Sequence, residues 1–383
     1  MIKLLIITLS YLLLFFNSSL FSAETKELKI GLLAPFSGVY KDLGQSILLS
    51  TQLALDEIDD SRIKIIPRDS GSNDLLKLKE AIKDISDSGA KVILGPTDSV
   101  YFDELEKYND LIFISLSNNH PNIKKNIVSI GISLESQLKS IEKFLVTQNK
   151  YRTIIMFPDN KYASFIEKKV SLLKLKNYKL FKYSSDPKLL TGQIQKLTNY
   201  GQRKRNLESR VKILEEREDT ESVRELKKLK QKYTLGGVNF DSVIIIDFGS
   251  SLKSVLTSLV FSDISEKDVL YTTVNQWFDE SIFYENSIKT LYYPSVNLKN
   301  FKKYNKKYFE TFNLKPNEIT ILAYDAIALI YYFWKKNKGI ESINNFLIKD
   351  KIKGKIGIFT FNEGKVFQEL NIYKTYNNSF VKY

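Results

Sequence analysis

The chain has 383 residues, a formal net charge of +13 and no cysteine. Its length is enough for two domains with their own cores, and the lack of cysteine excludes disulfide-held scaffolds. The single histidine, His120, precedes Pro121 in an expected loop, so zinc clusters and Cys–His pairs are excluded. The charge comes without an aromatic-interleaved basic motif, so we expect no nucleic acid partner.

A short apolar segment opens the chain. It runs from Lys3 to Phe16, nearly unbroken behind one lysine, and is too short to span a bilayer comfortably as a mature helix. We predict that residues 1–23 are a signal peptide that exports the protein to the periplasm. An uncleaved anchor is the alternative, because a cut after Ala23 would place bulky Phe21 where a small residue is preferred. Lipid attachment needs a cysteine, so we do not expect a lipoprotein.

The first predicted strand leads into a loop with two glycines. Residues 28–34 form a short apolar run, which is the pattern of a strand covered on both faces. Gly38 and Gly44 then allow tight turns, and a helix is predicted from about Gln45. Loops that leave the carboxyl end of a strand bind ligands in open α/β sheets. The candidate ligand contacts in this loop are Ser37 and Tyr40.

Strands and helices then alternate along most of the chain. The alternation predicts parallel sheets with helices on both faces. Two such series without a long flexible linker predict two similar α/β domains that face each other across a cleft. The predicted strands are 62–67, 91–96, 111–115, 152–157, 179–183, 242–247 and 269–273, and the predicted helices are 75–87, 134–146 and 163–174.

Residues 203–232 break this rhythm with 11 Lys or Arg and 7 Asp or Glu. Two apolar stripes at helical spacing flank a predicted turn at residues 219–220, which indicates a helical hairpin inserted in the second domain. The stripes consist of Leu207, Val211 and Leu214, and of Val223, Leu226 and Leu229. Such a hairpin either lies on a domain or binds a partner, and a solvated insertion without function is the alternative.

No catalytic motif accompanies these elements. The chain has no G-x-S-x-G elbow, no P-loop and no G-x-G-x-x-G after a strand. Asp98, Asp247 and Asp279 fall near predicted strand ends, where acids commonly cap helices or solvate loops. We therefore expect a protein that is not an enzyme and that holds no metal and no cofactor.

Short motifs follow one another in a fixed order along the mature chain. They are Ile30-Gly-Leu-Leu-Ala-Pro-Phe-Ser-Gly38, Leu43-Gly-Gln45, Arg68-Asp-Ser70, Val92-Ile-Leu-Gly-Pro-Thr-Asp-Ser99, Phe113-Ile-Ser-Leu-Ser117, Asp159-Asn-Lys-Tyr162, Gly354-Lys-Ile-Gly357 and Phe361-Asn-Glu-Gly364. Together they resemble the type I periplasmic binding proteins of the leucine/isoleucine/valine-binding family. The resemblance implies two doubly wound parallel-sheet domains joined by a hinge of three crossings. The expected lobes are 28–129 plus 295–352, and 130–294 plus 353–383.

The resemblance also implies where a ligand binds. In this family each domain contributes groups from its strand ends, and small hydroxyls with backbone N–H groups suit a carboxylate. The implied positions here are Thr97, Asp98 and Ser99 in one turn, Ser115, Ser117 and Asn119 in the next, and Tyr162, Gln276 and Trp277 in the second domain. Turn capping is the alternative role for the serines and Asn119, and a lid on the domain's own core is the alternative for Tyr162.

Departures from the family pattern leave two functions open. Leu43 stands where several amino-acid binders have a cleft tyrosine, and only Asp98 or Asp279 is placed to pair with an ammonium group. A second similarity, to the penicillin-binding-protein activators, lies in Tyr200-Gly-Gln-Arg203, the charged hairpin, Leu235 to Gly249 and Asn275-Gln-Trp277. The favoured function is capture of a small polar solute, such as an amino acid, for a membrane permease. The alternative is activation of a peptidoglycan synthase through protein contact.

Overall fold

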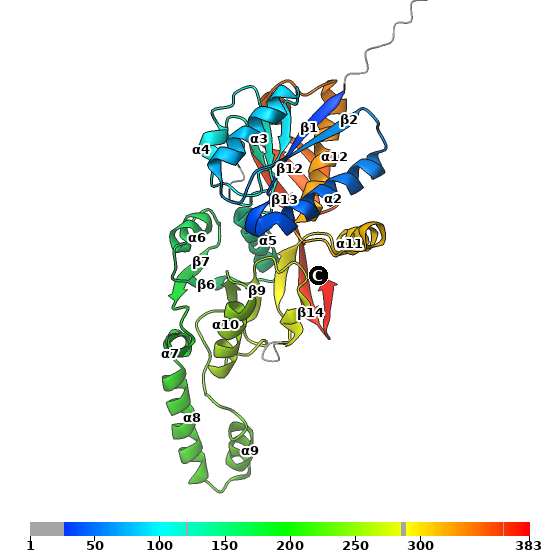
Figure 1. Ribbon diagram of the computed structural model, residues 1–383. Coiled ribbons are helices and arrows are strands. Elements are labelled where there is room, and N and C mark those ends of the chain that lie inside the picture. The colour runs from blue at the N-terminus through cyan, green and yellow to red at the C-terminus, as the bar shows by residue number, and fades with distance from the viewer. Residues whose placement is uncertain (1–26, 120–121, 285–288, 363) are drawn as a thin grey trace, which may run out of the picture.

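The computed structural model describes residues 27–119, 122–284, 289–362 and 364–383. The predicted signal peptide and the pair His120-Pro121 lie outside these residues. The described chain is an α/β protein with two main sheets, one above the other in Figure 1. The α/β class predicted from the sequence is therefore confirmed. No helix of the described ranges is long and apolar enough to cross a membrane.

The first sheet has five parallel strands in the order β2-β1-β3-β4-β5. They are β1 (Leu28–Ala34), β2 (Ile63–Asp69), β3 (Val92–Leu94), β4 (Ile112–Ser115) and β5 (Ile127–Ser129). Every residue of β3, β4 and β5 is buried, because helices cover both faces of the sheet. Alternate side chains of each strand therefore enter two separate cores.

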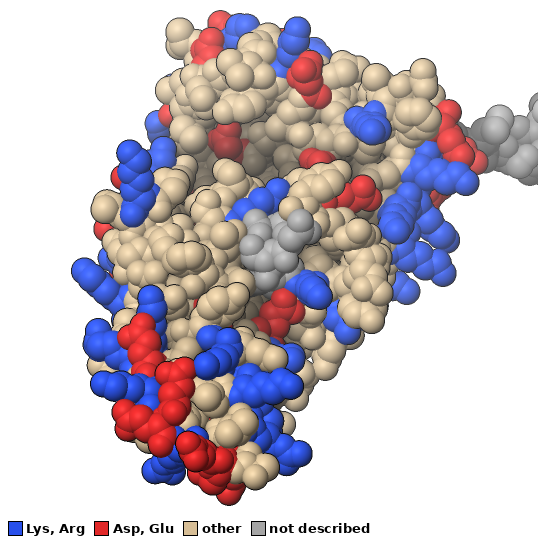
Figure 2. Space-filling model, turned by 90° about the horizontal axis from the view of Figure 1, so that it is seen from below, with Lys and Arg blue, Asp and Glu red and all other residues tan. Residues whose placement is uncertain are grey.

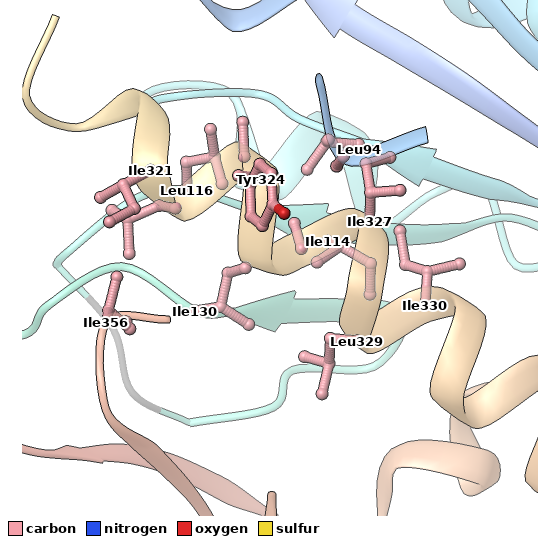
Figure 3. Close-up of a cluster of buried hydrophobic side chains, with 14 of the residues drawn as sticks. Leu94, Ile114, Leu116, Ile130, Ile321, Tyr324, Ile327, Leu329, Ile330 and Ile356 are labelled. Atoms are coloured by element: carbon pink, nitrogen blue, oxygen red, sulfur yellow. The ribbon is translucent and has the colours of Figure 1, made fainter. Parts of the chain in front are cut away.

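Two pairs of helices cover this sheet. Helices α3 (Leu75–Asp87) and α4 (Phe102–Leu105) cover one face, and α2 (Lys41–Ile58) and α12 (Thr320–Asn337) cover the other. Figure 3 shows Leu94 and Ile114 of the sheet in one apolar cluster with Ile327 of α12. The chain thus returns to the first sheet after building the second. Helix α11 (Leu298–Phe312), which contacts α2, begins this return.

Helix α2 begins at Lys41, earlier than the predicted start near Gln45. Gly44 therefore lies inside the helix and does not form a turn. A Cβ atom at this position would lie 2.0 Å from the carbonyl oxygen of Pro35, so the glycine allows the helix to pack closely on the preceding loop.

The second sheet has seven strands in the order β15-β14-β10-β9-β8-β6-β7. They are β6 (Arg152–Pro158), β7 (Asn177–Tyr183), β8 (Ser242–Ile245), β9 (Leu270–Thr273), β10 (Tyr292–Ser295), β14 (Asn371–Tyr376) and β15 (Ser379–Lys382). Helices α5 (Leu134–Thr147), α6 (Ala163–Val170), α7 (Pro187–Leu197) and α10 (Gly249–Phe261) pack against it.

The second sheet is mixed, so the prediction of two fully parallel sheets is wrong in this part. Strand β14 pairs antiparallel with β10 and with β15. For β15 the reason is the short connection, since only residues 377–378 lie between β14 and β15. A parallel crossover needs a dozen or more residues.

A third, antiparallel sheet was not predicted. It consists of β11 (Asp350–Lys353), β12 (Ile358–Asn362) and β13 (Lys365–Glu369). Phe361 of β12 packs on Phe333 of α12, with ring centroids 5.4 Å apart. Strands β11 and β12 pair across the predicted lobe boundary at residue 353. The division of the chain into lobes stays a prediction. Among the described residues, three short 3-10 helices complete the fold, over Gly38–Tyr40, Glu280–Tyr284 and Ile343–Phe346.

Two helices occupy the charged segment, where the hairpin is predicted. They are α8 (Tyr200–Glu215) and α9 (Thr220–Leu229), and they extend away from the second sheet (Figure 1). Asp219 caps α9, since its side chain accepts the backbone N–H of Ser222. The turn therefore spans residues 216–219, so it includes Asp219 of the predicted pair but not Thr220, which is already helical.

Candidate functional site

The loop after β1 is tied to the end of β2 by an acid. The Asp69 carboxylate accepts the backbone N–H of Phe36 at 2.8 Å and that of Gly71 at 2.9 Å. Burial alone would raise the pKa of Asp69, but these bonds and one from the Ser37 hydroxyl outweigh it and hold the pKa below its ordinary value. The loop is thus fixed by a charged group at the sheet edge.

Ser37 and Tyr40, the predicted ligand contacts of this loop, differ in their surroundings. Ser37 is half-buried, and its hydroxyl accepts a hydrogen bond from Lys77 at 3.2 Å. Tyr40 is exposed, and its backbone N–H donates to the Ser72 hydroxyl. Both lie at the carboxyl end of the first sheet, as predicted from the order of strand and loop.

The turns after β3 and β4 are bonded to each other. Ser115 is fully buried, and its hydroxyl donates to the Pro96 carbonyl at 2.9 Å and accepts the Ser117 N–H at 3.1 Å. The Ser117 hydroxyl is also buried and accepts the Asn119 N–H. These two hydroxyls therefore hold the turns in shape, the role that the capping alternative gives them.

Ser99 and Asn119 meet across the same pair of turns. The Asn119 amide donates to the Ser99 hydroxyl at 2.8 Å, and Asn119 is exposed. Thr97 is half-buried, whereas Asp98 is exposed and accepts the Val100 N–H at 3.0 Å. These groups form a polar rim at the carboxyl end of the first sheet.

The candidate residues of the second sheet have separate surroundings. Tyr162 is exposed at the start of α6, with the Lys161 ammonium 5.1 Å from its ring centroid. The Gln276 amide donates to the Asp247 and Val274 carbonyls, both at 3.1 Å. Trp277 packs against the large core next to Phe301 of α11. The Gln276 donors and the Trp277 ring are thus already engaged within the protein.

Asn275 positions the Trp277 segment. It is buried, and its side-chain oxygen accepts the Ser295 hydroxyl at 2.8 Å and the Trp277 N–H at 3.0 Å. Trp277 and Phe278 both have left-handed backbone, with φ of 50° and 60°. Each such residue costs about 1–2 kcal/mol, so the surrounding bonds and packing must hold the segment.

The sequence analysis missed an acid on α12. Asp325 is buried and accepts the backbone N–H groups of Lys355 at 2.7 Å and Ile356 at 2.8 Å, which fixes the segment between β11 and β12. Burial raises the pKa of Asp325 to about 6, although these two bonds act in the opposite direction. A lone carboxylate within the apolar run of residues 319–334 was the available signal.

The hairpin is bonded through Arg203 to loops that flank the second sheet. This side chain is buried, and its guanidinium donates to the carbonyls of Gly236, Ser262 and Asp263 at 3.0, 3.1 and 2.8 Å. It also donates to the Thr234 hydroxyl at 2.7 Å. The loop after α9 and the end of α10 therefore meet at one cation.

Beyond this base, α8 and α9 stabilise each other. Arg210 donates to both carboxylate oxygens of Glu225, at 2.9 and 2.7 Å, and Lys230 pairs with Glu215 at 2.9 Å. Five of the six predicted stripe residues lie in a small cluster around Leu207, Leu214 and Leu229, whereas Val223 is exposed and lies outside it. Figure 2, seen from below, shows Lys and Arg interleaved with Asp and Glu over this end of the molecule. No group of three or more His, Asp and Glu among the described residues could hold a metal ion.

Comparison with known proteins identifies the fold. A family model described as periplasmic binding protein matches residues 27–167. No curated protein matches the chain. The C-domain of LpoA from Haemophilus influenzae, a regulator of PBP1A, is 14% identical, with 93% of this chain and 99% of that one covered and a TM-score of 0.64. The match to full-length LpoA covers 59% of the length of that protein.

Branched-chain amino acid binders are similar too. An inferred branched-chain amino acid ABC transporter protein from Rhodospirillum rubrum is 10% identical. The match covers 93% of this chain and 100% of that chain, with a TM-score of 0.72. LivJ from Streptococcus pneumoniae, in complex with isoleucine, is 18% identical, with 94% and 100% covered and a TM-score of 0.52. The matched family consists of non-enzymatic binders, in line with the prediction for this chain. The chain therefore has the type I periplasmic binding protein fold, which confirms the family resemblance drawn from its sequence.

Proposed function

We propose that this protein acts in the periplasm by binding a partner protein through the α8–α9 hairpin, and that the partner is a peptidoglycan synthase. The observation that carries the proposal is the build of the hairpin. It is fixed to the body by the buried Arg203 and has ion pairs and an apolar cluster of its own. Neither sheet needs this segment for its core, so a contact beyond the molecule is the best account of it.

The surface of the hairpin supports this role. Ile213 on α8 and Val223 on α9 are 45% and 53% exposed, amid the charged residues. Exposed apolar side chains on a rigid, charged element are suited to the centre of a protein contact. The similar LpoA C-domain is a regulator of PBP1A, and this likeness supports the choice of a synthase as partner.

The candidate ligand residues favour the same conclusion. The hydroxyls of Ser115 and Ser117 and the amide of Gln276 bond within the protein. Leu43 and Trp277 pack against the large core instead of offering polar groups. A site for free amino acids would need more unsatisfied donors and acceptors at these positions.

Replacing residues 207–230 by a short Gly-Ser link tests the proposal. The change keeps Arg203 and Thr234, so the base of the hairpin stays bonded. The variant should no longer bind the purified synthase or stimulate its activity. Thermal unfolding of the remaining protein should be unchanged. Leu172→Ala is the matched control, because Leu172 is 50% exposed after α6, outside the hairpin. Full stimulation by the hairpin-free variant would contradict the proposal.

Solute capture for a membrane permease is the second candidate. It is favoured by the polar rim of the first sheet, where Ser37, Thr97, Asp98, Ser99 and Asn119 follow strand ends. Thermal unfolding with a panel of amino acids tests it, since a ligand at a hundredfold excess over its dissociation constant stabilises by about 2.7 kcal/mol. A saturable shift that Ser99→Ala and Asn119→Ala abolish would support capture.

A further inference from the structure

A cavity of about 510 Å³ lies away from all the candidate ligand residues. Its walls come from α5, from the third sheet at β12 and β13, and from β14 and β15 of the second sheet. It therefore opens where the chain passes from the third sheet into the second. Small-molecule sites are commonly cavities of about 300–1,000 Å³ at such junctions.

Cationic groups dominate the charge of this cavity. Lys139, Lys143 and Lys382 line it, and within the described ranges neither Lys143 nor Lys382 lies within ion-pair distance of an acid. The lining acid Glu369 is paired with Lys351 at 2.6 Å. Lys143 acts on Glu369 only through its charge, without an ion-pair contact, so the ammonium groups of Lys143 and Lys382 leave an excess of positive charge that attracts an anion.

The walls also offer aromatic surface. Phe144, Phe367 and Tyr383 line the cavity, and the Lys139 ammonium lies 3.8 Å from the centroid of the Phe367 ring. The Phe144 and Tyr383 rings are 5.2 Å apart and nearly perpendicular. Phe144 is itself buried, but a flat apolar group can pack on the more accessible rings of Phe367 and Tyr383 while an attached anion meets the lysines.

Two buried polar side chains complete the cavity. The Ser136 hydroxyl donates to the Gln368 side-chain oxygen at 3.1 Å, and the Gln368 amide donates to the Ile130 carbonyl at 2.9 Å. These bonds join α5 and β13 to the segment that follows β5. A bound molecule would thus lie against the contacts that connect the first and second sheets.

We propose that this cavity binds a small organic anion that carries an aromatic ring, as in an aryl phosphate. The anion lies near Lys143 and Lys382, and the ring packs on Phe367 and Tyr383. Because the cavity does not include α8 or α9, the site is independent of the hairpin and of the function proposed for it.

Calorimetric titration of the full chain with phenyl phosphate tests this site. We expect saturable binding, at least tenfold weaker in Lys143→Glu and unchanged in Lys83→Glu, a matched charge reversal on α3. Inorganic phosphate, which lacks the ring, should bind at least tenfold more weakly than phenyl phosphate. The proposal would be overturned if phenyl phosphate did not bind, or if Lys143→Glu bound it with unchanged affinity. It would also be overturned if inorganic phosphate bound with equal affinity, because the site would then hold an adventitious ion only.

Discussion

The Arg203 guanidinium donates to the Ser262 carbonyl over 3.1 Å, which links the first turn of α8 to the residue that directly follows α10. This bond and its neighbours make the hairpin a rigid extension of the second sheet. Arginine suits the position because its planar fork donates to several acceptors at once.

Arg203→Ala should loosen the base of the hairpin. The buried carbonyls and the Thr234 hydroxyl would lose their donor, at a cost of about 3 kcal/mol. Amide hydrogen exchange should become faster across α8 and α9, whereas exchange in the first sheet should not change. Arg203→Lys keeps the positive charge but not the planar guanidinium. Its amide exchange in α8 and α9 should therefore be faster than in the unaltered chain and slower than in Arg203→Ala. Unchanged exchange in Arg203→Ala would show that the hairpin is held in another way.

Gly354→Ala should destabilise the segment between β11 and β12. An added Cβ atom would lie 2.5 Å from the Asp325 carboxylate and 2.8 Å from the Phe359 ring. Overpacking of this kind costs about 1–3 kcal/mol, which urea unfolding can measure. Gly237→Ala is the control, because nothing lies within 4 Å of its added Cβ atom and its stability should not change.

Stability should depend on pH through Asp325. Its pKa is about 6 in the folded protein and 3.8 ordinarily, so the folded state binds the proton more strongly. The contribution of this group is fully present below about pH 4 and is lost as the pH rises through about 6, up to about 3 kcal/mol. Asp325→Asn should flatten the curve of unfolding free energy against pH in this window. A curve identical to that of the unaltered chain would exclude Asp325 as the cause.

Glu57 should act in a different pH window. Its desolvation opposes ionisation, but hydrogen bonds from Lys355, Tyr324 and Lys307 outweigh this and lower its pKa to about 2. Its contribution is present above about pH 4.5 and is lost as the pH falls toward 2. Glu57→Gln should therefore change stability mainly above pH 4.5 and reduce the loss on further acidification. An unchanged dependence of the unfolding free energy on pH below about 4.5 in Glu57→Gln would contradict this role of Glu57.

Asn275→Ala should destabilise the protein by about 3 kcal/mol. The buried Ser295 hydroxyl and the Trp277 N–H would both lose their acceptor, and the left-handed segment would lose its support. Denaturant unfolding measures the change, with exposed Asn239→Ala as the control. A loss equal to that of the control would show that packing alone holds the segment.

Much of the fold could be predicted from the sequence. Apolar runs such as β1 and β4 fit only strands covered on both faces, and the stripes of α8 and α9 specify a hairpin. The third sheet could not be predicted, because β11 and β13 are only four and five residues long and contain one and two apolar residues, without the alternation that marks a strand. The antiparallel pair of β14 and β15 depends on a two-residue connection between strands that were not predicted.

The candidate site was less predictable, since a sequence gives residue types and not their directions. Ser115 and Ser99 both lie at or after strand ends, yet Ser115 is fully buried and Ser99 is half-exposed beside Asn119. Arg203 appears in the sequence as one basic residue of a charged run. Its role depends on carbonyls some 30 to 60 residues away, which meet it only in the folded chain.

Site-specific photo-crosslinking to the purified synthase tests the central claim most directly. A photoreactive residue at Val223 of α9 places the probe on the exposed side of the hairpin, and the same residue at Leu172 serves as the reference. We predict a crosslink to the synthase from Val223 and none from Leu172. A complex that forms without any crosslink from Val223, or that crosslinks from Leu172 instead, would contradict binding through the hairpin.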